Sequence, residues 1–180
     1  FQTQLDIAGL IYTKPDNVTE IPVKEFNGLS YNYAVKLSGG NLEIRYAIRP
    51  IIKELFDRYE KREKREGDSI LHPNKIHRVV SRWMYSKMSG GKISQQEVSI
   101  KYLKPEIIKT NIGADVGTIY AGSVSPEYGG QYTFGLFVML HKDNVGDVYI
   151  QYLFEKESEM TDVFKEITGP GQLMYAFKFK

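Results

Sequence analysis

Two segments in which apolar and polar residues alternate constrain the fold of this chain most strongly. The first is "NYAVKLSGGNLEIRYAIRP" at 32–50, which alternates on both sides of Gly39-Gly40. Glycine adopts a positive φ at little cost, so a Gly-Gly pair favours a two-residue hairpin turn. We therefore predict a hairpin with one buried face and one solvated face, the latter carrying Glu43, Arg45 and Arg49. The predicted pairs are Tyr33–Tyr46, Ala34–Arg45, Val35–Ile44 and Lys36–Glu43.

The second segment, "YTFGLFVMLHKDNVGDVYIQYLFEK" at 132–156, predicts a longer hairpin. A three-residue turn at 144–146, with Gly146 in the left-handed conformation, suits this pattern. That turn pairs Leu140 with Ile150. Phe137 and Met139 are apolar on the reverse side, so this strand is expected to lie in the centre of a sheet with helices against it.

Further elements alternate with these hairpins along the chain. A helix is expected to begin at Pro50 and to fade into the charged run that ends at Gly67. A second helix is expected over 72–91, with Trp83 as a core anchor. Further helices are expected at about 105–110 and 160–167, a short amphipathic stretch at 98–103, and strands at 115–124 and 172–179. The order predicts one α+β domain over residues 1–180, an α/β sandwich with an antiparallel sheet flanked by helices.

Composition and charge narrow the classes of function. The 24 Lys and Arg residues exceed the 22 Asp and Glu residues by only two, which gives no reason to expect nucleic acid as a partner. Without cysteine there is no disulfide, thiolate or Cys-type zinc site. No apolar run approaches the roughly 20 residues of a membrane-spanning helix. The first residue is Phe1 and not Met, which is consistent with a removed signal peptide and predicts a periplasmic or secreted protein.

The order of "GLIYTKPDNV", "EIRYAIRP" and "GADVGTIYAG", followed by a long hairpin, a helix and a final strand, resembles the Mog1/PsbP-like fold. The resemblance is strongest to uncharacterised exported proteins from bacteria of the Bacteroidetes type, and it spans most of residues 8–179. It implies an antiparallel sheet between helices and work as an accessory subunit or binding partner. No functional residue of that family can be carried over, because no motif matches.

The segment 113–132 holds the candidate binding residues. It combines small residues, a Gly-Gly loop and tyrosines, and the chain has 13 tyrosines in all. A tyrosine ring offers a large apolar face with a polar tip, which suits strands and binding surfaces alike. Asp115 could accept hydrogen bonds from a ligand or could cap a turn. We therefore predict a non-enzymatic protein that binds a protein or small ligand through Asp115, Tyr120, Tyr128 and Tyr132, without a cofactor.

Two alternatives remain open on the sequence alone. One is a hydrolase that uses Asp115 with His77 or Glu127 as acid and base. The other is a cytosolic accessory protein that binds a GTPase. His72 and His77 are five residues apart and His141 is remote in sequence, so surface histidines are expected and no metal site is predicted.

Overall fold

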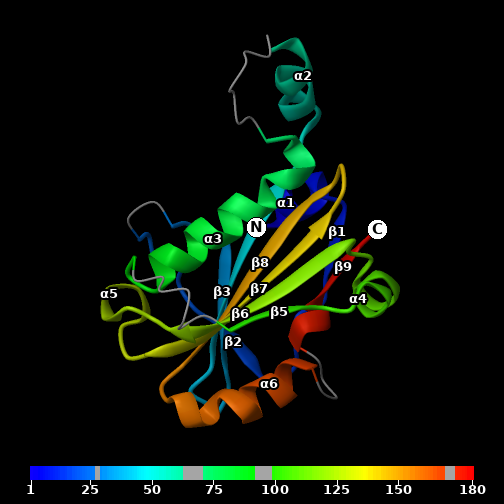
Figure 1. Cartoon of the computed structure of the whole chain (residues 1–180). Coiled ribbons are helices and arrows are strands. Elements are labelled where there is room, and N and C mark those ends of the chain that lie inside the picture. Colours follow the sequence, from blue (N-terminus) through cyan, green and yellow to red (C-terminus); the bar gives the residue numbers. More distant parts are fainter. Residues whose placement is uncertain (27–28, 63–70, 92–98, 169–172) are drawn as a thin grey trace.

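An antiparallel sheet in the order β2-β3-β4-β8-β7-β6-β5 organises the structure (Figure 1). The structure is a computed structural model that describes residues 1–26, 29–62, 71–91, 99–168 and 173–180. Within these residues every neighbouring pair of strands in the sheet is antiparallel. The strands are β2 (Val18–Glu20), β3 (Tyr33–Leu37), β4 (Glu43–Pro50), β5 (Ser99–Tyr102), β6 (Val116–Ser123), β7 (Phe134–Lys142) and β8 (Gly146–Phe154).

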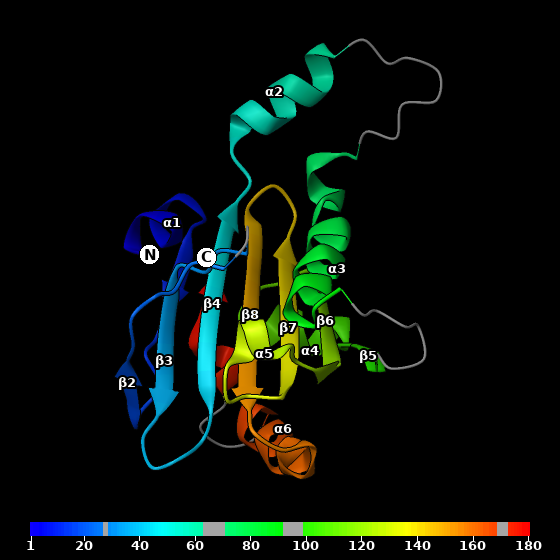
Figure 2. The same ribbon diagram turned by 90° about the vertical axis from the view of Figure 1, so that its left-hand side faces the viewer.

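Each face of this sheet packs on its own layer (Figures 1 and 2). One face is covered by α3 (His77–Met88) and α5 (Pro126–Gly129), which meet an apolar cluster that includes Phe137 and Tyr149. The other face carries Val138 and Ile150, which belong to a second apolar cluster. Its covering elements are α1 (Gln2–Ile7), α4 (Pro105–Ile112), α6 (Met160–Thr168) and a two-stranded sheet of β1 (Leu10–Tyr12) and β9 (Phe177–Phe179). The predicted α+β architecture, an antiparallel sheet flanked by helices, is confirmed.

The first hairpin has the predicted register, but Arg45 on its polar face is not solvated. Tyr33 pairs with Tyr46 and Ala34 with Arg45, and Gly39 has a φ of +76° in the turn. The prediction that Arg45 lies on a wet surface was wrong, since its side chain is only 3% exposed. The reason is α5, a segment remote in sequence, whose Tyr128 packs against the guanidinium.

The second hairpin is shifted by two residues from the predicted register. Leu140 pairs with Val148, and the loop lies between the pair Lys142 and Gly146. Asn144, with a φ of 62°, takes the left-handed position that we assigned to Gly146. A shift of two leaves every side chain on its predicted face, because the side-chain period of a strand is two.

Two helix predictions need correction. Pro50 closes β4 opposite Gly146, and α2 (Lys53–Lys61) begins three residues later without a buried residue. Proline suits that strand end because its fixed φ is compatible with extended backbone. Trp83 is 39% exposed, so it is not the expected core anchor. Instead α3, which follows the 3-10 turn η1 (Pro73–Lys75), buries His77, Ser81, Met84, Tyr85 and Met88.

The remaining predicted elements are present with modest changes of boundary. The final segment is a 3-10 turn, η3 (Leu173–Ala176), before the short strand β9, and another such turn, η2 (Glu157–Glu159), leads into α6. The expected helix stop at 169–170 and the end of the charged run at 63–67 lie outside the described residues. The N-terminal residues form α1, which buries Leu5.

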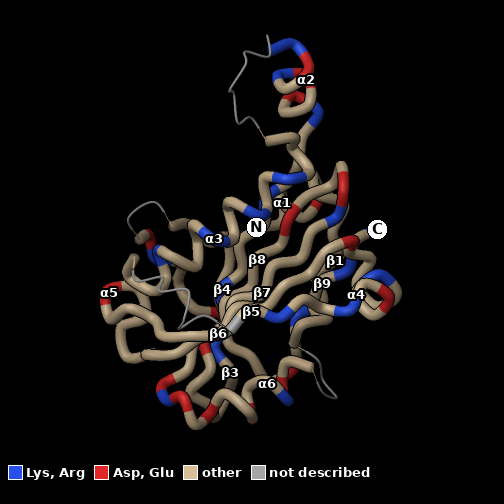
Figure 3. The backbone as a smooth tube through the Cα atoms, in the orientation of Figure 1, with Lys and Arg blue, Asp and Glu red and all other residues tan. Residues whose placement is uncertain are grey.

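Basic and acidic residues are interspersed along the backbone (Figure 3). On α2, for example, Lys53 and Asp57 form an ion pair of 2.8 Å one helical turn apart. Within the described part of the chain, no helix has the length and apolar character needed to cross a membrane.

Candidate functional site

A cavity of about 530 Å³ lies beside the turn that joins α5 to β7. Its volume falls in the range of roughly 300–1,000 Å³ that is typical of small-molecule sites. The lining combines aromatic rings with charged side chains from β3, β4 and the segment before β3, including Phe26, Lys36, Arg45, Tyr128 and Tyr132. A second cavity of about 270 Å³ shares Phe26, Glu127 and Tyr128 with it.

Arg45 forms the charged floor of the larger cavity. Its guanidinium carbon lies 4.7 Å from the ring centroid of Tyr128, 5.2 Å from Tyr31 and 5.5 Å from Phe26. Nε donates to the carboxylate of Glu43 at 2.6 Å, and Nη1 donates to the backbone carbonyl of Tyr128 at 3.1 Å. Burial opposes the positive charge, but Tyr128 and Glu43 outweigh it and raise the pKa of Arg45. The guanidinium therefore stays charged and is held rigidly in an aromatic enclosure.

Tyr128 links this floor to the centre of the sheet. Its hydroxyl donates to the side-chain carbonyl of Gln151, which is fully buried on β8 directly beside Arg45. Burial raises the pKa of Tyr128 to about 12, although Arg45 opposes that shift. The phenol thus remains protonated near neutral pH and serves as a fixed hydrogen-bond donor.

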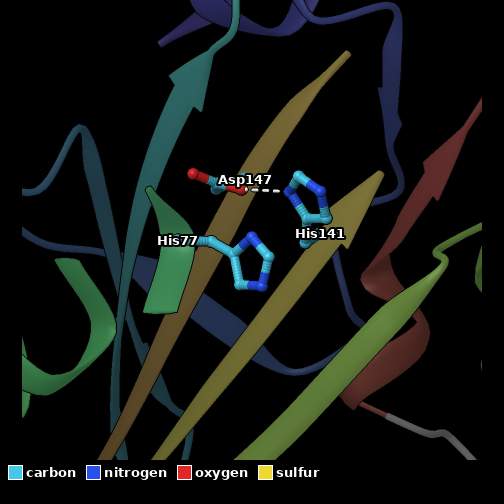
Figure 4. Close-up of side chains that lie close together, drawn as sticks. All are labelled: His77, His141 and Asp147. Carbon is cyan, nitrogen blue, oxygen red and sulfur yellow. Dashed lines mark hydrogen bonds and ion pairs between the residues drawn. The ribbon is translucent and has the colours of Figure 1, made fainter. Parts of the chain in front are cut away.

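A second polar group lies on the same sheet face at the other end of β8 (Figure 4). His77 at the start of α3, His141 at the end of β7 and Asp147 at the start of β8 are all buried. One potential ligand atom from each lies within 4.8 Å of the others. The two imidazole rings stack with centroids 4.0 Å apart. We call this group the histidine cluster.

Hydrogen bonds orient the histidine cluster. Nδ1 of His141 lies 2.7 Å from Oδ1 of Asp147, and its Nε2 lies 2.9 Å from the carboxylate of Asp143. The Tyr149 hydroxyl donates to the other oxygen of Asp147 at 3.0 Å. Reciprocal hydrogen bonds between Asn74 and Asn144, of 2.9 and 3.0 Å, tie the turn before α3 to the β7–β8 loop. These bonds orient His141 and hold the turn that precedes His77 against the β7–β8 loop.

The two histidines have opposite pKa shifts. Burial by itself lowers the pKa of His141, but the hydrogen bonds to Asp147 and Asp143 outweigh it and raise the pKa above its ordinary value. Burial, reinforced by the charge of His141, lowers the pKa of His77 to about 4. His77 is therefore a neutral imidazole near pH 7, and neither of its buried ring nitrogens has a hydrogen bond of ordinary geometry among the described residues.

The structure brings two of the four predicted binding residues together. Tyr128 and Tyr132 both line the larger cavity, although both are largely buried. Tyr120 lies beneath α3, where its hydroxyl is 3.3 Å from that of Ser81. Asp115 is exposed at the opposite end of β6, where its carboxylate accepts the backbone N–H of Asp143 at 3.0 Å. Asp115 thus caps the β7–β8 loop.

This placement bears on the alternative of a hydrolase. Asp115 precedes β6 and Glu127 follows it, so the strand separates the proposed acid and base. His77 stacks on His141 inside the histidine cluster. Sequence reasoning missed Arg45, Gln151 and Asp147 because each sits in an alternating strand pattern where a polar residue is expected to face water.

The fold and the cavity together define an α+β sandwich protein with a small, partly charged pocket at one end of its sheet. No family model matches the sequence, and no curated protein matches it. Among solved structures, the chain is similar to the solution structure of cyanobacterial PsbP (CyanoP) from Synechocystis sp. PCC 6803. The identity is 11% and the TM-score 0.48, over 96% of this chain and 88% of that chain. A likeness at this level carries no argument about function.

Proposed function

We propose that this protein is a non-catalytic binding protein whose larger cavity takes a small planar molecule with an anionic group. The observation that carries the proposal is the enclosure of a permanently charged Arg45 by three aromatic rings at the floor of a cavity of about 530 Å³. Aromatic walls with a few fixed polar groups are typical of small-ligand sites.

The charges of the lining favour an anion. Three cationic side chains, Lys24, Lys36 and Arg45, line the cavity with two acidic ones, Glu43 and Glu127. Glu43 already accepts from Arg45, at 2.6 Å. The lysines lie nearer to solvent than Arg45, since Lys24 is exposed and Lys36 is half-buried. A carboxylate of the ligand would meet these ammonium groups while its ring packs on Phe26 and Tyr132.

The polar groups of the floor are engaged with one another, which favours binding over catalysis. Arg45 donates to Glu43 and to the Tyr128 carbonyl, and the Tyr128 hydroxyl donates to Gln151. Groups held in this way preserve the shape of a site, and a phenol with a raised pKa is a poor general base.

A titration monitored by two-dimensional NMR tests the proposal. The probes are benzoate and indole-3-acetate, with benzamide and indole-3-acetamide as uncharged controls. We expect saturable shifts for Gly129, Gly130 and Tyr132 with the carboxylates. Exchanging both Lys24 and Lys36 for Met should weaken carboxylate binding at least tenfold without a change in thermal stability, while Lys109→Met on α4 has no effect. Failure of every carboxylate to give saturable shifts at these residues would refute the proposal.

We retain a periplasmic or secreted location as part of this proposal, in keeping with the cysteine-free sequence. Cell fractionation followed by immunoblotting tests it. The resemblance to exported proteins of the Bacteroidetes type also stays a prediction. The genomic origin of the chain would test it.

A further inference from the structure

The histidine cluster has a donor set that fits a transition metal ion. Imidazole nitrogens and carboxylate oxygens are the ligands that Zn²⁺ and its neighbours take in proteins. Here two imidazoles and one carboxylate converge from three different elements, with one atom of each inside a span of 4.8 Å. Zinc bonds of about 2.0–2.1 Å in a tetrahedron place ligand atoms roughly 3.3 Å apart, so small side-chain rotations suffice to bring all three into contact with one ion.

The surrounding hydrogen bonds are those of an outer shell around a metal. A ligating histidine commonly donates its second ring nitrogen to a carboxylate, which fixes the tautomer and the orientation of the ring. Asp143 occupies that position at Nε2 of His141, 2.9 Å away. This leaves Nδ1 of His141 directed at Oδ1 of Asp147, while Tyr149 holds the other carboxylate oxygen.

His77 supplies an independent observation. His77 is only 3% exposed, and neither ring nitrogen has a hydrogen bond of ordinary geometry among the described residues, although the backbone of Asn74 interacts weakly with the ring. Leaving a buried polar group unpaired costs about 1–3 kcal/mol. In Figure 4 one nitrogen of this ring points toward the gap between His141 and Asp147. A cation in that gap would satisfy the unpaired nitrogen.

Charge balance supports the same occupant. Asp147 and Asp143 together carry two negative charges beside His141, at 2.7 and 2.9 Å. A divalent cation bound beside His141 would compensate both of these charges.

We propose that His77, His141 and Asp147 form a binding site for a divalent transition metal ion of the Zn²⁺ type, with Asp143 and Tyr149 as positioning residues. This site is separate from the larger cavity. Asp147 and Gln151 are four positions apart on β8, a distance of roughly 13 Å along a strand. The inference does not depend on the proposed function.

The test starts from protein treated with a chelator and then dialysed, with Zn²⁺ as the probe in calorimetry and Co²⁺ as a spectroscopic probe. We expect one Zn²⁺ per chain, a rise in melting temperature of about 5–10 °C at 100 times the dissociation constant, and a visible Co²⁺ absorption band. His77→Leu should lower the affinity at least 100-fold. Since it removes an unpaired buried nitrogen, it should leave the metal-free protein as stable as before or more so.

Two further variants separate this site from surface binding and from misfolding. Asp147→Asn retains the shape of the carboxylate and should also lose Zn²⁺ affinity, with Co²⁺ absorption abolished. His72→Ala removes the third histidine of the chain. His72 is half-buried and accepts a hydrogen bond from the backbone N–H of Asn74 at 3.2 Å. This variant should bind Zn²⁺ as the wild type does. Equal affinity of wild type and His77→Leu, loss of binding in His72→Ala, or no stoichiometric binding below about 100 µM would overturn the proposal.

Discussion

Replacing Arg45 by Met tests whether the buried guanidinium holds α5 on the sheet. The change keeps most of the side-chain volume but leaves the Glu43 carboxylate, 13% exposed, and the Tyr128 carbonyl without their donor. Each hydrogen bond to a charged group contributes about 1.5–3 kcal/mol, and stacking on buried rings adds about 1–2 kcal/mol. The variant also avoids the desolvation cost of Arg45, so we expect a net loss of about 3–5 kcal/mol in the free energy of unfolding.

Urea unfolding followed by circular dichroism at pH 7 measures this loss. Arg45→Lys should recover less than half of it, because an ammonium cannot stack as a planar fork or reach both acceptors at once. Adding Glu43→Gln to Arg45→Met should restore part of the stability by removing the unpaired carboxylate. Arg82→Met, at an exposed position on α3, is the control and should change stability by no more than about 0.5 kcal/mol. A loss below about 1 kcal/mol for Arg45→Met would show that the enclosure does not stabilise the fold.

Three other predictions follow from the packing. Met84→Ala should lower the free energy of unfolding by about 2–5 kcal/mol. Trp83→Ala, on the outer face of α3, should lower it by less than half as much. Equal losses for the two variants in thermal unfolding would contradict the observed helix face. Burial raises the pKa of Tyr12 and Tyr128 to about 12. Both stay protonated in the folded protein while the unfolded chain ionises near pH 10. The stability that these two protonated tyrosines give the fold is therefore complete below pH 10. It is lost as the pH rises toward 12, by about 1.4 kcal/mol per pH unit for each residue. Denaturant titrations that superimpose at pH 9, 10 and 11 would refute this. Asn74→Ala breaks both hydrogen bonds to Asn144 and should weaken Zn²⁺ binding about tenfold in calorimetry, whereas an unchanged affinity would show that the Asn74–Asn144 pair does not position His77.

The first hairpin shows how far local pattern determines structure. Its register is set by two facts inside one short segment, the conformational freedom of Gly39 and the alternation of residues on either side. The second hairpin has the same kind of pattern, but its turn is also held from outside, by Asn74 on Asn144. Asparagine adopts the left-handed conformation more readily than most residues, and with Asn144 in that position the register differs by two residues from the prediction.

The candidate site shows the limit of the same reasoning. Tyr128 and Tyr132 could be named from the sequence because a Gly-Gly loop rich in aromatic residues is an unusual local feature. Arg45 could not, since a charged residue at every second position is the ordinary pattern of a strand with one face in water. On α3, the buried face includes the polar residues His77 and Ser81, and the apolar Trp83 lies outside it. A prediction that assigns apolar residues to the buried face therefore placed Trp83 inside the core by mistake.

The sequence by itself therefore determined the α+β class, the order of the two hairpins and of α3, α4 and α6, the faces of both hairpins and the first hairpin's register. All of these depend on interactions between residues near one another along the chain. Only the tertiary structure decided which polar side chains lose contact with water and meet one another. Arg45 is buried by a helix more than eighty residues away, and His77 reaches His141 and Asp147 only because α3 lies across the sheet. Burial depends on what packs from elsewhere, and the local pattern does not contain that information.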